Sequence, residues 1–509
     1  MNSFQRIRPL LAGSIKIWIP LALWLALWLS ISPGNLQNIS HPERFIDFLN
    51  GLRALFPFVA GGIAGLILLY VAYNRRFDVS LFKGPLGLMF LYAAIGLIAI
   101  LRSSDMSQSA YWVGSYISVP LVLWAIASGP DRLGMARRIV DLTWLLMAVA
   151  GVVLIAYAFL RLDLLNAILH PEILENCRFG PAWFFDTSGA LRSTGVGRYG
   201  AVACLIAIAG IAHGRWRIFW QLLFVAALLL LLSSGARTAF VAFVGASTLM
   251  VLLYGGRRSI VIGSVATIII LPVFLITGAH KTVVSECLLR RAPPVYLIQN
   301  DVPIIRASGT NESFFNLGPD VVKTKSGVGG TAVLPNPSGT IRPDQGATSS
   351  SNSEPTAIQP NIIVIEAPFV SFSGRSEVWR EGLKLIKKSP LLGYGFNSDR
   401  ILLGAHMHQA FLHSLVQTGV LGTIPLVAGI LLAWWFLFKA IRHLKDFTKE
   451  HRSRIVLASG ILAFFTIRSL AESSGAFFGI DWLILAPVLL YLPVVDRSNE
   501  AKIVEEPLS

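Results

Sequence analysis

A cluster of histidines near the end of the chain is the feature best suited to proton transfer. The segment HMHQAFLHSLVQTGVLG covers residues 406–422. His408, Gly419 and Gly422 follow helical spacing, so we expect them on one face of a helix, with the glycines forming a stripe against which another helix packs. A neutral imidazole near physiological pH can accept a proton from a hydroxyl group. The alternative role for His408 is that of a polar anchor at a helix end.

The remaining polar residues of this segment are expected to assist His408. Gln409 directly follows it and is predicted to be a supporting residue. His406 and His413 fall on other faces of the expected helix, and we predict surface or packing roles for them. His408 is therefore the one candidate base of the segment.

Arginines supply the second candidate feature, a site for an anion. Arg237 lies in LLLLLSSGARTAF beside two apolar runs, Arg375 opens an amphipathic segment, and Arg192 and Arg198 bracket the sequence STGVG. A guanidinium at membrane depth is costly unless it meets an anion, and its planar fork matches phosphate oxygens. We predict a phosphate site with Arg237 and Arg375 as main ligands and the other two arginines as further ones. Each arginine taken alone is also compatible with snorkelling to lipid headgroups.

An ion pair is expected near the last two apolar runs. Arg468 and Glu472 stand four residues apart, so we predict that they form a structural salt bridge, and the alternative is a supporting role in which the pair orients Arg237 or a bound acceptor. The role of Asp481 stays open. The sequence contains no GxxxxGK[ST] loop and no zinc-ligand spacing among its His and Cys residues, and it has no close acidic pair on the predicted periplasmic side. The chemistry is therefore expected to use arginine electrostatics and a histidine base, with no metal and no cofactor.

The elements that position these residues are predicted to be membrane-spanning helices. The 509 residues are 54% hydrophobic and 14% charged, with a mean hydropathy of +0.64, which exceeds what a water-soluble core requires. The net charge of +15 comes from short Lys and Arg clusters between apolar runs, a distribution typical of membrane orientation and not of nucleic-acid binding. We predict an all-α polytopic membrane protein with about twelve transmembrane helices. Its apolar runs lie near 17–32, 54–73, 85–101, 110–128, 140–160, 199–213, 217–233, 238–255, 259–277, 419–441, 455–475 and 481–495.

The connections between these runs differ in charge from one side to the other. The positive-inside rule places the basic connections in the cytoplasm together with both termini. The first run follows a basic stretch and precedes no small-residue cleavage site, so we expect an uncleaved anchor. The other side, predicted to be periplasmic, receives the connections at 160–198, 233–237 and 278–404. The basic connections contain Arg75, Arg76, Lys83, Arg132, Arg137, Arg138, Arg215, Arg217, Arg257, Arg258 and the stretch 442–454.

The largest predicted periplasmic segment interrupts the helices at residues 278–407. Its part at 306–361 is rich in Ser, Thr, Gly, Pro and Asn and is expected to be disordered. The flanking apolar pieces 294–299 and 361–370 could pair as strands. A helix is predicted at 373–389, with one apolar side that suits the membrane interface. The predicted domains are therefore helices one to nine at 1–277, this loop at 278–407, helices ten to twelve at 408–495 and a cytoplasmic tail at 496–509.

Three cysteines are too few for a disulfide scaffold. Cys204 falls within an apolar run. Cys177 and Cys287 either pair in an oxidising compartment or remain as two free thiols, and the sequence leaves both possibilities open.

The order of these segments resembles the superfamily of O-antigen ligases and polymerases. His408 and Gln409, nine further residues and then GVLG fit the ligase pattern of His, then Asn, Ser or Gln, nine residues, Gly, two residues and Gly, Thr or Tyr. Arg237 in SSGARTAF matches the arginine that follows the seventh span in this family. The segments GRSEVW and SPLLGYG match the periplasmic segment that precedes the histidine. The resemblance covers roughly residues 190–480.

The resemblance implies a transferase that uses a lipid-linked glycan in the bacterial inner membrane, with its active site on the periplasmic side. The donor would be a glycan on undecaprenyl diphosphate, and the acceptor either the lipid A-core sugar or another glycan. His408 would deprotonate the acceptor hydroxyl, which attacks the anomeric carbon with inversion, while Arg237 and Arg375 stabilise the leaving diphosphate.

Two other functions remain open at this level. A polysaccharide polymerase of the same superfamily would use the same residues, and the insertion at 306–361, which most relatives lack, leaves the acceptor undetermined. A transporter or channel would also need many spans and charged residues such as Arg468 and Glu472 within them. No repeat between the two halves of the sequence supports transport.

Overall fold

The computed structural model divides the chain into two compact units, which we call unit 1 and unit 2. Unit 1 contains Met1–Thr282 and Phe372–Ser509, and unit 2 contains Val283–Ser371. The residues that the structure describes are 18–30, 45–74, 82–129, 131–160, 193–214, 216–234, 236–254, 295–299, 361–365 and 375–505. Of the sequence predictions, the apolar run 259–277, the segment 306–360, Arg192, Cys177 and Cys287 lie outside these residues.

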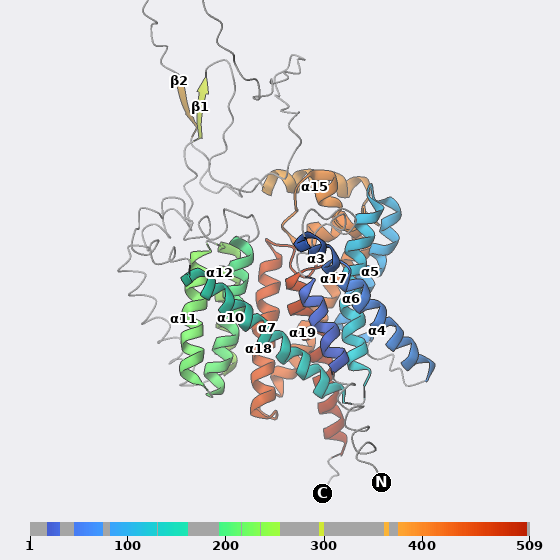
Figure 1. The fold of residues 1–509 in the computed structure, drawn as a ribbon, viewed down its shortest axis with the longest axis vertical. Coiled ribbons are helices and arrows are strands. Elements are labelled where there is room, and N and C mark those ends of the chain that lie inside the picture. The colour runs from blue at the N-terminus through green and yellow to red at the C-terminus, as the bar shows by residue number, and fades with distance from the viewer. Residues whose placement is uncertain are drawn as a thin grey trace, which may run out of the picture. The chain divides into compact units, whose positions relative to one another are not determined.

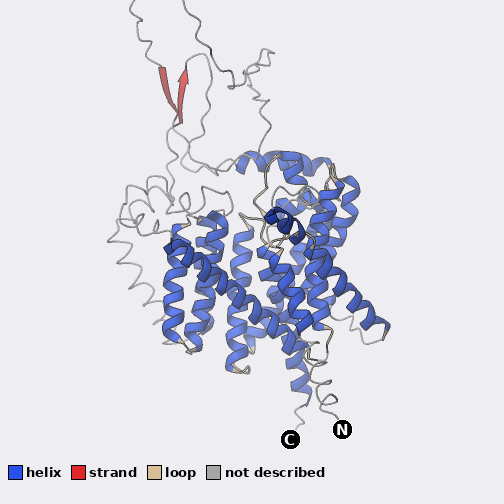
Figure 2. Ribbon diagram, viewed as in Figure 1, coloured by secondary structure: helices blue, strands red, loops and turns tan. Residues whose placement is uncertain are grey.

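The described part of unit 2 is a pair of antiparallel strands. β1 (Val295–Gln299) pairs with β2 (Asn361–Ile365), so that Val295 faces Ile365 and Gln299 faces Asn361. The predicted strand pairing is thereby confirmed. The prediction of an all-α protein holds for the described residues of unit 1, which Figure 2 shows as helices joined by loops.

Unit 1 places a helix on each predicted apolar run that the structure describes. Five of its helices are long and apolar enough to cross a membrane, and shorter apolar helices include one at Trp18–Leu29. The total of about twelve spans stays a prediction. The helices are α3 (Phe45–Arg53), α4 (Phe56–Tyr73), α5 (Pro85–Ala99), η2 (Ile100–Arg102), α6 (Met106–Ala127), α7 (Arg132–Leu160), α10 (Ser193–His213), α11 (Arg217–Ser233), α12 (Arg237–Tyr254), α15 (Arg375–Lys388), α16 (Ser398–Leu403), α17 (Ala410–Arg442), α18 (Lys449–Ser469) and α19 (Ile480–Glu505).

The core of unit 1 forms around α18 and α19. Residues 455–465 of α18 and 482–493 of α19 are buried without interruption, as is typical of apolar helical stretches that are enclosed on every side. On one side α10 and α12 pack against α18, and on the other α5 and α17 pack together next to α19 (Figure 1). α7 crosses this arrangement obliquely and contacts α10, α11 and α19 (Figure 1). The thiol of Cys204 is buried in α10 and forms no disulfide.

The outer surface of these helices is apolar. Leu66 and Leu69 on α4, Ile218 and Leu222 on α11 and Leu431 on α17 are each more than 60% exposed. Large apolar side chains exposed on several long apolar helices are suited to contact with lipid, and the backbone groups beneath them are bonded within the helices. The protein is therefore embedded in a membrane.

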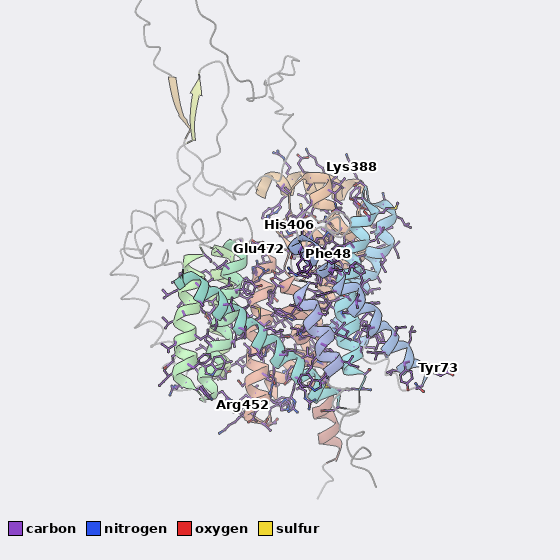
Figure 3. All side chains as sticks on the ribbon, viewed as in Figure 1. Phe48, Tyr73, Lys388, His406, Arg452 and Glu472 are labelled. Carbon is purple, nitrogen blue, oxygen red and sulfur yellow. The ribbon has the colours of Figure 1, made fainter. Side chains whose placement is uncertain are left out.

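The histidines and the basic connection at 442–454 lie at opposite ends of the helical unit. Figure 3 shows His406, Glu472 and Lys388 at one end and Arg452 at the other. At the Arg452 end, Arg454 binds Asp141 through two hydrogen bonds of 2.8 and 2.9 Å, which join α18 to α7. The basic connection at 442–454 thus lies at the end opposite the histidines, as the sequence predicts.

The last helix is longer than expected. The predicted final span ends at residue 495, but α19 continues to Glu505. A salt bridge of 2.8 Å between Lys439 and Asp496 ties this extension to α17. The beginning of the predicted tail is therefore helical.

α17 is broken at Gly419, which overturns the predicted glycine stripe. Gly419 has φ 60° and ψ −164°, a backbone conformation essentially restricted to glycine. The residue packs against the backbone of Leu391 and not against another helix, and a β-carbon at Gly419 would overlap the Leu391 carbonyl. Gly422 lies against the side chain of Thr418 on the far side of the break. Helical spacing therefore does not hold across this part of the sequence.

The loop 390–395 bonds the backbone groups that the break leaves without helical partners. The carbonyls of Val416 and Gln417 accept from the N–H groups of Tyr394 and Gly395 at 2.9 and 2.8 Å. The N–H of Val420 donates to the Pro390 carbonyl at 2.8 Å, and that of Leu421 to the Leu391 carbonyl at 3.2 Å. Because unpaired backbone groups in an apolar interior cost several kcal/mol, the loop and the broken helix stabilise each other.

We expect Gly419→Ala to destabilise the folded protein. The backbone conformation alone costs a non-glycine residue about 1–3 kcal/mol, and the overlap with Leu391 adds to this. Thermal unfolding of the purified protein in detergent measures the effect. The control is Gly62→Ala on α4, where a β-carbon meets nothing within 4 Å and the change should be neutral or stabilising. Equal unfolding temperatures for the two variants would contradict this account.

Candidate active site

A buried carboxylate organises the histidine segment. Asp399, on α16, is fully buried, and its Oδ2 accepts hydrogen bonds from the Met407 N–H at 3.0 Å and from Nδ1 of both His406 and His413 at 2.9 Å. Burial raises the pKa of this carboxyl, but attraction by His413 and His406, together with their hydrogen bonds, holds it well below its usual value. Asp399 is therefore ionised, and both Nδ1 atoms must carry a proton, because a carboxylate can only accept.

His406 and His413 are parts of this cluster and not the surface or packing residues that the sequence predicts. Nε2 of His406 lies 2.7 Å from Ser473 Oγ. Nε2 of His413 lies 2.8 Å from the side-chain amide of Gln417, which also contacts the Tyr92 hydroxyl at 2.9 Å. Every ring nitrogen of the two histidines has a partner, so the rings are fixed in orientation.

The same cluster is the candidate for metal binding among the described residues. Asp399, His406 and His413 each offer one ligand atom, and these atoms lie within 4.8 Å of one another. The donor set is one that a transition metal accepts. However, each contact has the length of an ordinary hydrogen bond, and the two imidazole N–H groups account for both histidine contacts. We therefore describe the three residues as a hydrogen-bonded cluster.

His408 lies beside this cluster in a strained backbone conformation. Its φ of 51° is unusual for a residue other than glycine, and such residues concentrate at functional sites. The preceding residue is held on both sides, since the Met407 N–H donates to Asp399 and its carbonyl accepts from Trp379 Nε1 at 2.7 Å. The His408 ring packs at 4.9 Å from the His406 ring, and 22% of its side chain is exposed. The base candidate is thus fixed and accessible.

The carboxylate of Glu472 faces His408. Its Oε2 lies 3.3 Å from His408 Nδ1, and the Glu472 side chain is only 8% exposed. A carboxylate at this distance favours a proton on Nδ1 and leaves Nε2 with a lone pair. This arrangement suits a general base, because the carboxylate also stabilises the imidazolium that forms when Nε2 accepts a proton.

Gln409 begins α17 and separates His408 from the helix. It is the N-cap residue, and its side-chain oxygen accepts a hydrogen bond from the Leu412 N–H. The predicted placement of His408 on a face of this helix is therefore wrong. As the N-cap, Gln409 fixes the point at which the strained segment ends, and its supporting role in the site stays a prediction.

The predicted salt bridge between Arg468 and Glu472 is not formed. α18 ends at Ser469, so Glu472 lies beyond the helix that holds Arg468, and the described residues show no salt bridge between the two side chains. Glu472 faces His408, whereas the Arg468 guanidinium binds Asp481 and donates to Ser474 at 3.0 Å. Asp481, whose role the sequence left open, links two arginines, because its second oxygen binds Arg198 at 2.7 Å. We call Arg198, Arg468 and Asp481 the cationic cluster.

The cationic cluster carries more positive than negative charge. Two guanidinium groups share one carboxylate, and Arg198 and Arg468 are only 19% and 4% exposed. The Nε atoms of both arginines are buried and have no hydrogen-bond partner among the described residues. A partly buried surplus of guanidinium charge is suited to bind an anion.

The structure describes the other predicted arginines only in part. Arg237 and Arg375 are the first residues of α12 and α15, and the placement of their side chains lies outside what the structure describes. The start of α12 nevertheless lies near Arg198. Gly197, the neighbour of Arg198, packs directly against Ser234 and Ala236, which lie just before α12. α15 contacts the histidine segment through Trp379. The backbone thus brings both helix starts to the end of unit 1 that holds His408.

Sequence reasoning missed Asp399, Ser473 and the roles of His406 and His413. One signal was available, since three of the nine histidines of the chain fall between residues 406 and 413. Because the sequence analysis assumed a continuous helix through this segment, it placed the three histidines on different faces of that helix. The carboxylate of Asp399, seven residues before His406, accepts hydrogen bonds from two of these histidines. No periodic pattern in the sequence reveals such a contact.

We expect the stability of the protein to fall as the pH is lowered from about 6.5 towards 4, because the unfolded His406 then binds a proton that the folded one excludes. Burial, as the largest effect, lowers the pKa of His406 to about 4 despite the attraction of Asp399. The contribution of His406 to the free energy of unfolding is complete above the pKa of this histidine in the unfolded chain, and it amounts to about 3 kcal/mol. Thermal unfolding across this pH range measures it in the wild type and in His406→Gln.

His406→Gln should lack this part of the pH dependence. The control is His443→Gln, whose side chain is 58% exposed and should leave the curve unchanged. Parallel curves for the wild type and His406→Gln would show that this histidine does not carry the effect.

Comparison with known proteins agrees with the geometry. Residues 222–427 match the family described as O-antigen ligase, and this range includes Arg237, Arg375, His408 and Gly419. The chain is also similar to the exopolysaccharide production protein ExoQ of Rhizobium meliloti (strain 1021), with 24% identity over 119 residues. That match covers 20% of this chain and 26% of the length of the relative. Residues 222–427 of the chain are thus similar to the O-antigen ligase family, in line with the pattern that begins at His408.

Proposed function

We propose that this protein transfers a glycan from undecaprenyl diphosphate to an acceptor sugar at the periplasmic face of the bacterial inner membrane. The observation that carries the proposal is the pairing of His408 with Glu472 at the end of unit 1 opposite the basic connection 442–454. The positive-inside rule makes the basic end cytoplasmic, so the pair faces the periplasm. Lipid-linked glycans present their diphosphate at this depth of the membrane.

In the proposed reaction His408 acts as the general base. Its Nε2 takes the proton of an acceptor hydroxyl, and the resulting oxygen attacks the anomeric carbon of the donor sugar. The bond from that carbon to the phosphate oxygen breaks, the leaving diphosphate takes the electron pair, and the configuration inverts. Glu472 stabilises the imidazolium, as the carboxylate of a serine-hydrolase triad does for its histidine.

The guanidinium groups are assigned to the donor. Arg198, Arg237, Arg375 and Arg192 bind the diphosphate in this proposal, and Arg468 supports them by holding Asp481 against Arg198. Stabilising the charge that grows on the leaving group is often the largest contribution to catalysis. The mechanism uses no metal ion, since cationic side chains supply the charge that a metal would otherwise provide.

The acceptor that we propose is the lipid A-core, which makes the reaction an O-antigen ligation. The spacing from His408 to Gly422 fits the ligase pattern. A polysaccharide polymerase is the second candidate, and the similarity to the Rhizobium relative, an exopolysaccharide production protein, favours it. A deletion strain separates the two: loss of a ligase leaves the core without any glycan, whereas loss of a polymerase leaves caps of a single repeat.

We expect His408→Ala to reduce glycan transfer by about 10²–10⁴-fold, the usual contribution of a general base. The assay uses purified protein, a carrier-linked donor and the acceptor, and in cells the carrier-linked glycan should accumulate. The control is His443→Ala, an exposed histidine beyond the far end of α17 that should retain full activity. Transfer by His408→Ala within a factor of two of the wild type would reject the assignment.

A further inference from the structure

The hydroxyl of Ser473 lies beside the proposed base and has no role in the mechanism so far. Ser473 directly follows Glu472, whose carboxylate faces His408, and its Oγ lies 2.7 Å from Nε2 of His406. The rings of His406 and His408 are 4.9 Å apart. Ser473 as a residue is partly exposed.

The hydrogen-bond chain fixes the direction of the Ser473 proton. Asp399 accepts from Nδ1 of His406, so this nitrogen carries the ring proton. Burial lowers the pKa of His406 to about 4, and the ring is therefore neutral near physiological pH, with a lone pair on Nε2. Ser473 must donate its proton to this lone pair. Its oxygen is left with lone pairs only and can accept, but not donate, a further hydrogen bond.

An oxygen that only accepts discriminates between the two substrates. Phosphate oxygens are also acceptors, so Ser473 has no attraction for the diphosphate of the donor. A sugar hydroxyl is a donor and matches it. We infer that Ser473 Oγ binds a hydroxyl group of the acceptor sugar and thereby holds the acceptor against His408. The inference rests on the proposed function and adds a binding residue for one of its substrates.

The loop that carries Ser473 is rigid enough to position a substrate. The Tyr116 hydroxyl donates to the Gly475 carbonyl at 2.7 Å, and the Tyr92 hydroxyl lies 2.8 Å from the Ala476 carbonyl. Phe477 packs against the ring of His413 with 5.6 Å between ring centres. A binding group held by its neighbours loses little entropy when the substrate arrives.

Another role for Ser473 would be that of a nucleophile, since Ser473, His406 and Asp399 follow the order of a serine-hydrolase triad. In that role His406 must accept the serine proton and become charged. A ring whose pKa is lowered to about 4 by burial is a weak base for this step. The binding role needs no proton transfer, and the test below distinguishes the two.

The test compares kinetic constants for both substrates in Ser473→Ala, Ser473→Thr and the wild type. We expect Ser473→Ala to raise KM for the acceptor about tenfold, the effect of one lost hydrogen bond, with KM for the donor and kcat unchanged. Ser473→Thr keeps the hydroxyl and should restore much of the affinity. The matched control is Ser469→Ala, whose hydroxyl bonds the Thr466 carbonyl within α18.

A second measurement does not depend on the folding of a variant. Acceptors that lack single hydroxyl groups are tested with the wild type, and one of them should show the same tenfold rise in KM. For that acceptor, Ser473→Ala should cause no further rise in KM. If no single hydroxyl matters to the wild type, the inference is wrong.

The remaining outcomes separate this inference from the proposed function. A fall in kcat with unchanged acceptor KM would overturn the binding role and favour the nucleophile, and a rise in donor KM would assign Ser473 to the other substrate. If His408→Ala is inactive and Ser473→Ala is normal, only the inference fails. If His408→Ala is active, the proposed function itself fails.

Discussion

The ionised carboxylate of Asp399 fixes the segment from which His408 is presented. A carboxylate without partners would be destabilised in this buried position by several kcal/mol, so it depends on the two imidazole N–H groups and the Met407 N–H. Each hydrogen bond to such a charged group contributes about 1.5–3 kcal/mol. His408 lies between two of these donors, His406 and His413, in the sequence. Its strained φ of 51° is tolerated because the chain on both sides cannot relax independently.

The break in α17 connects this cluster to the helical unit. The loop 390–395 bonds the backbone groups that Gly419 leaves free, and the same loop leads directly into α16 and Asp399. Gly393 has φ 63° and lies against the backbone of Gln417, so a side chain at this position would both strain and obstruct the contact. The SPLLGYG segment of the family resemblance therefore has a physical explanation. It is the piece of backbone that allows a membrane helix to open beside the site.

The sequence predicted the helices well and the contacts of the site poorly, and the physical reason is the same in both cases. Long apolar runs specify helices because the lipid permits little else, and helices lie on the described runs. Spacing arguments for His408, Gly419 and the pair Arg468 and Glu472 all assumed that a helix continues. α17 begins only at Ala410 and opens at Gly419, and α18 ends at Ser469. Residues just outside a helix follow no period, and the site is built from such residues.

The segment 468–473 connects the cationic cluster to the pair formed by His408 and Glu472. Arg468 binds Asp481 in the cationic cluster, Glu472 faces His408, and Ser473 contacts His406. In the proposed reaction, positive charge develops on His408 beside a carboxylate, while negative charge develops on the leaving diphosphate beside a surplus of guanidinium groups. Each end of the site thus carries charge of the sign opposite to that which the transition state produces there. A short, bonded segment between the two ends sets their separation before either substrate binds, and this fixed separation is what a direct displacement requires of its base and its leaving group.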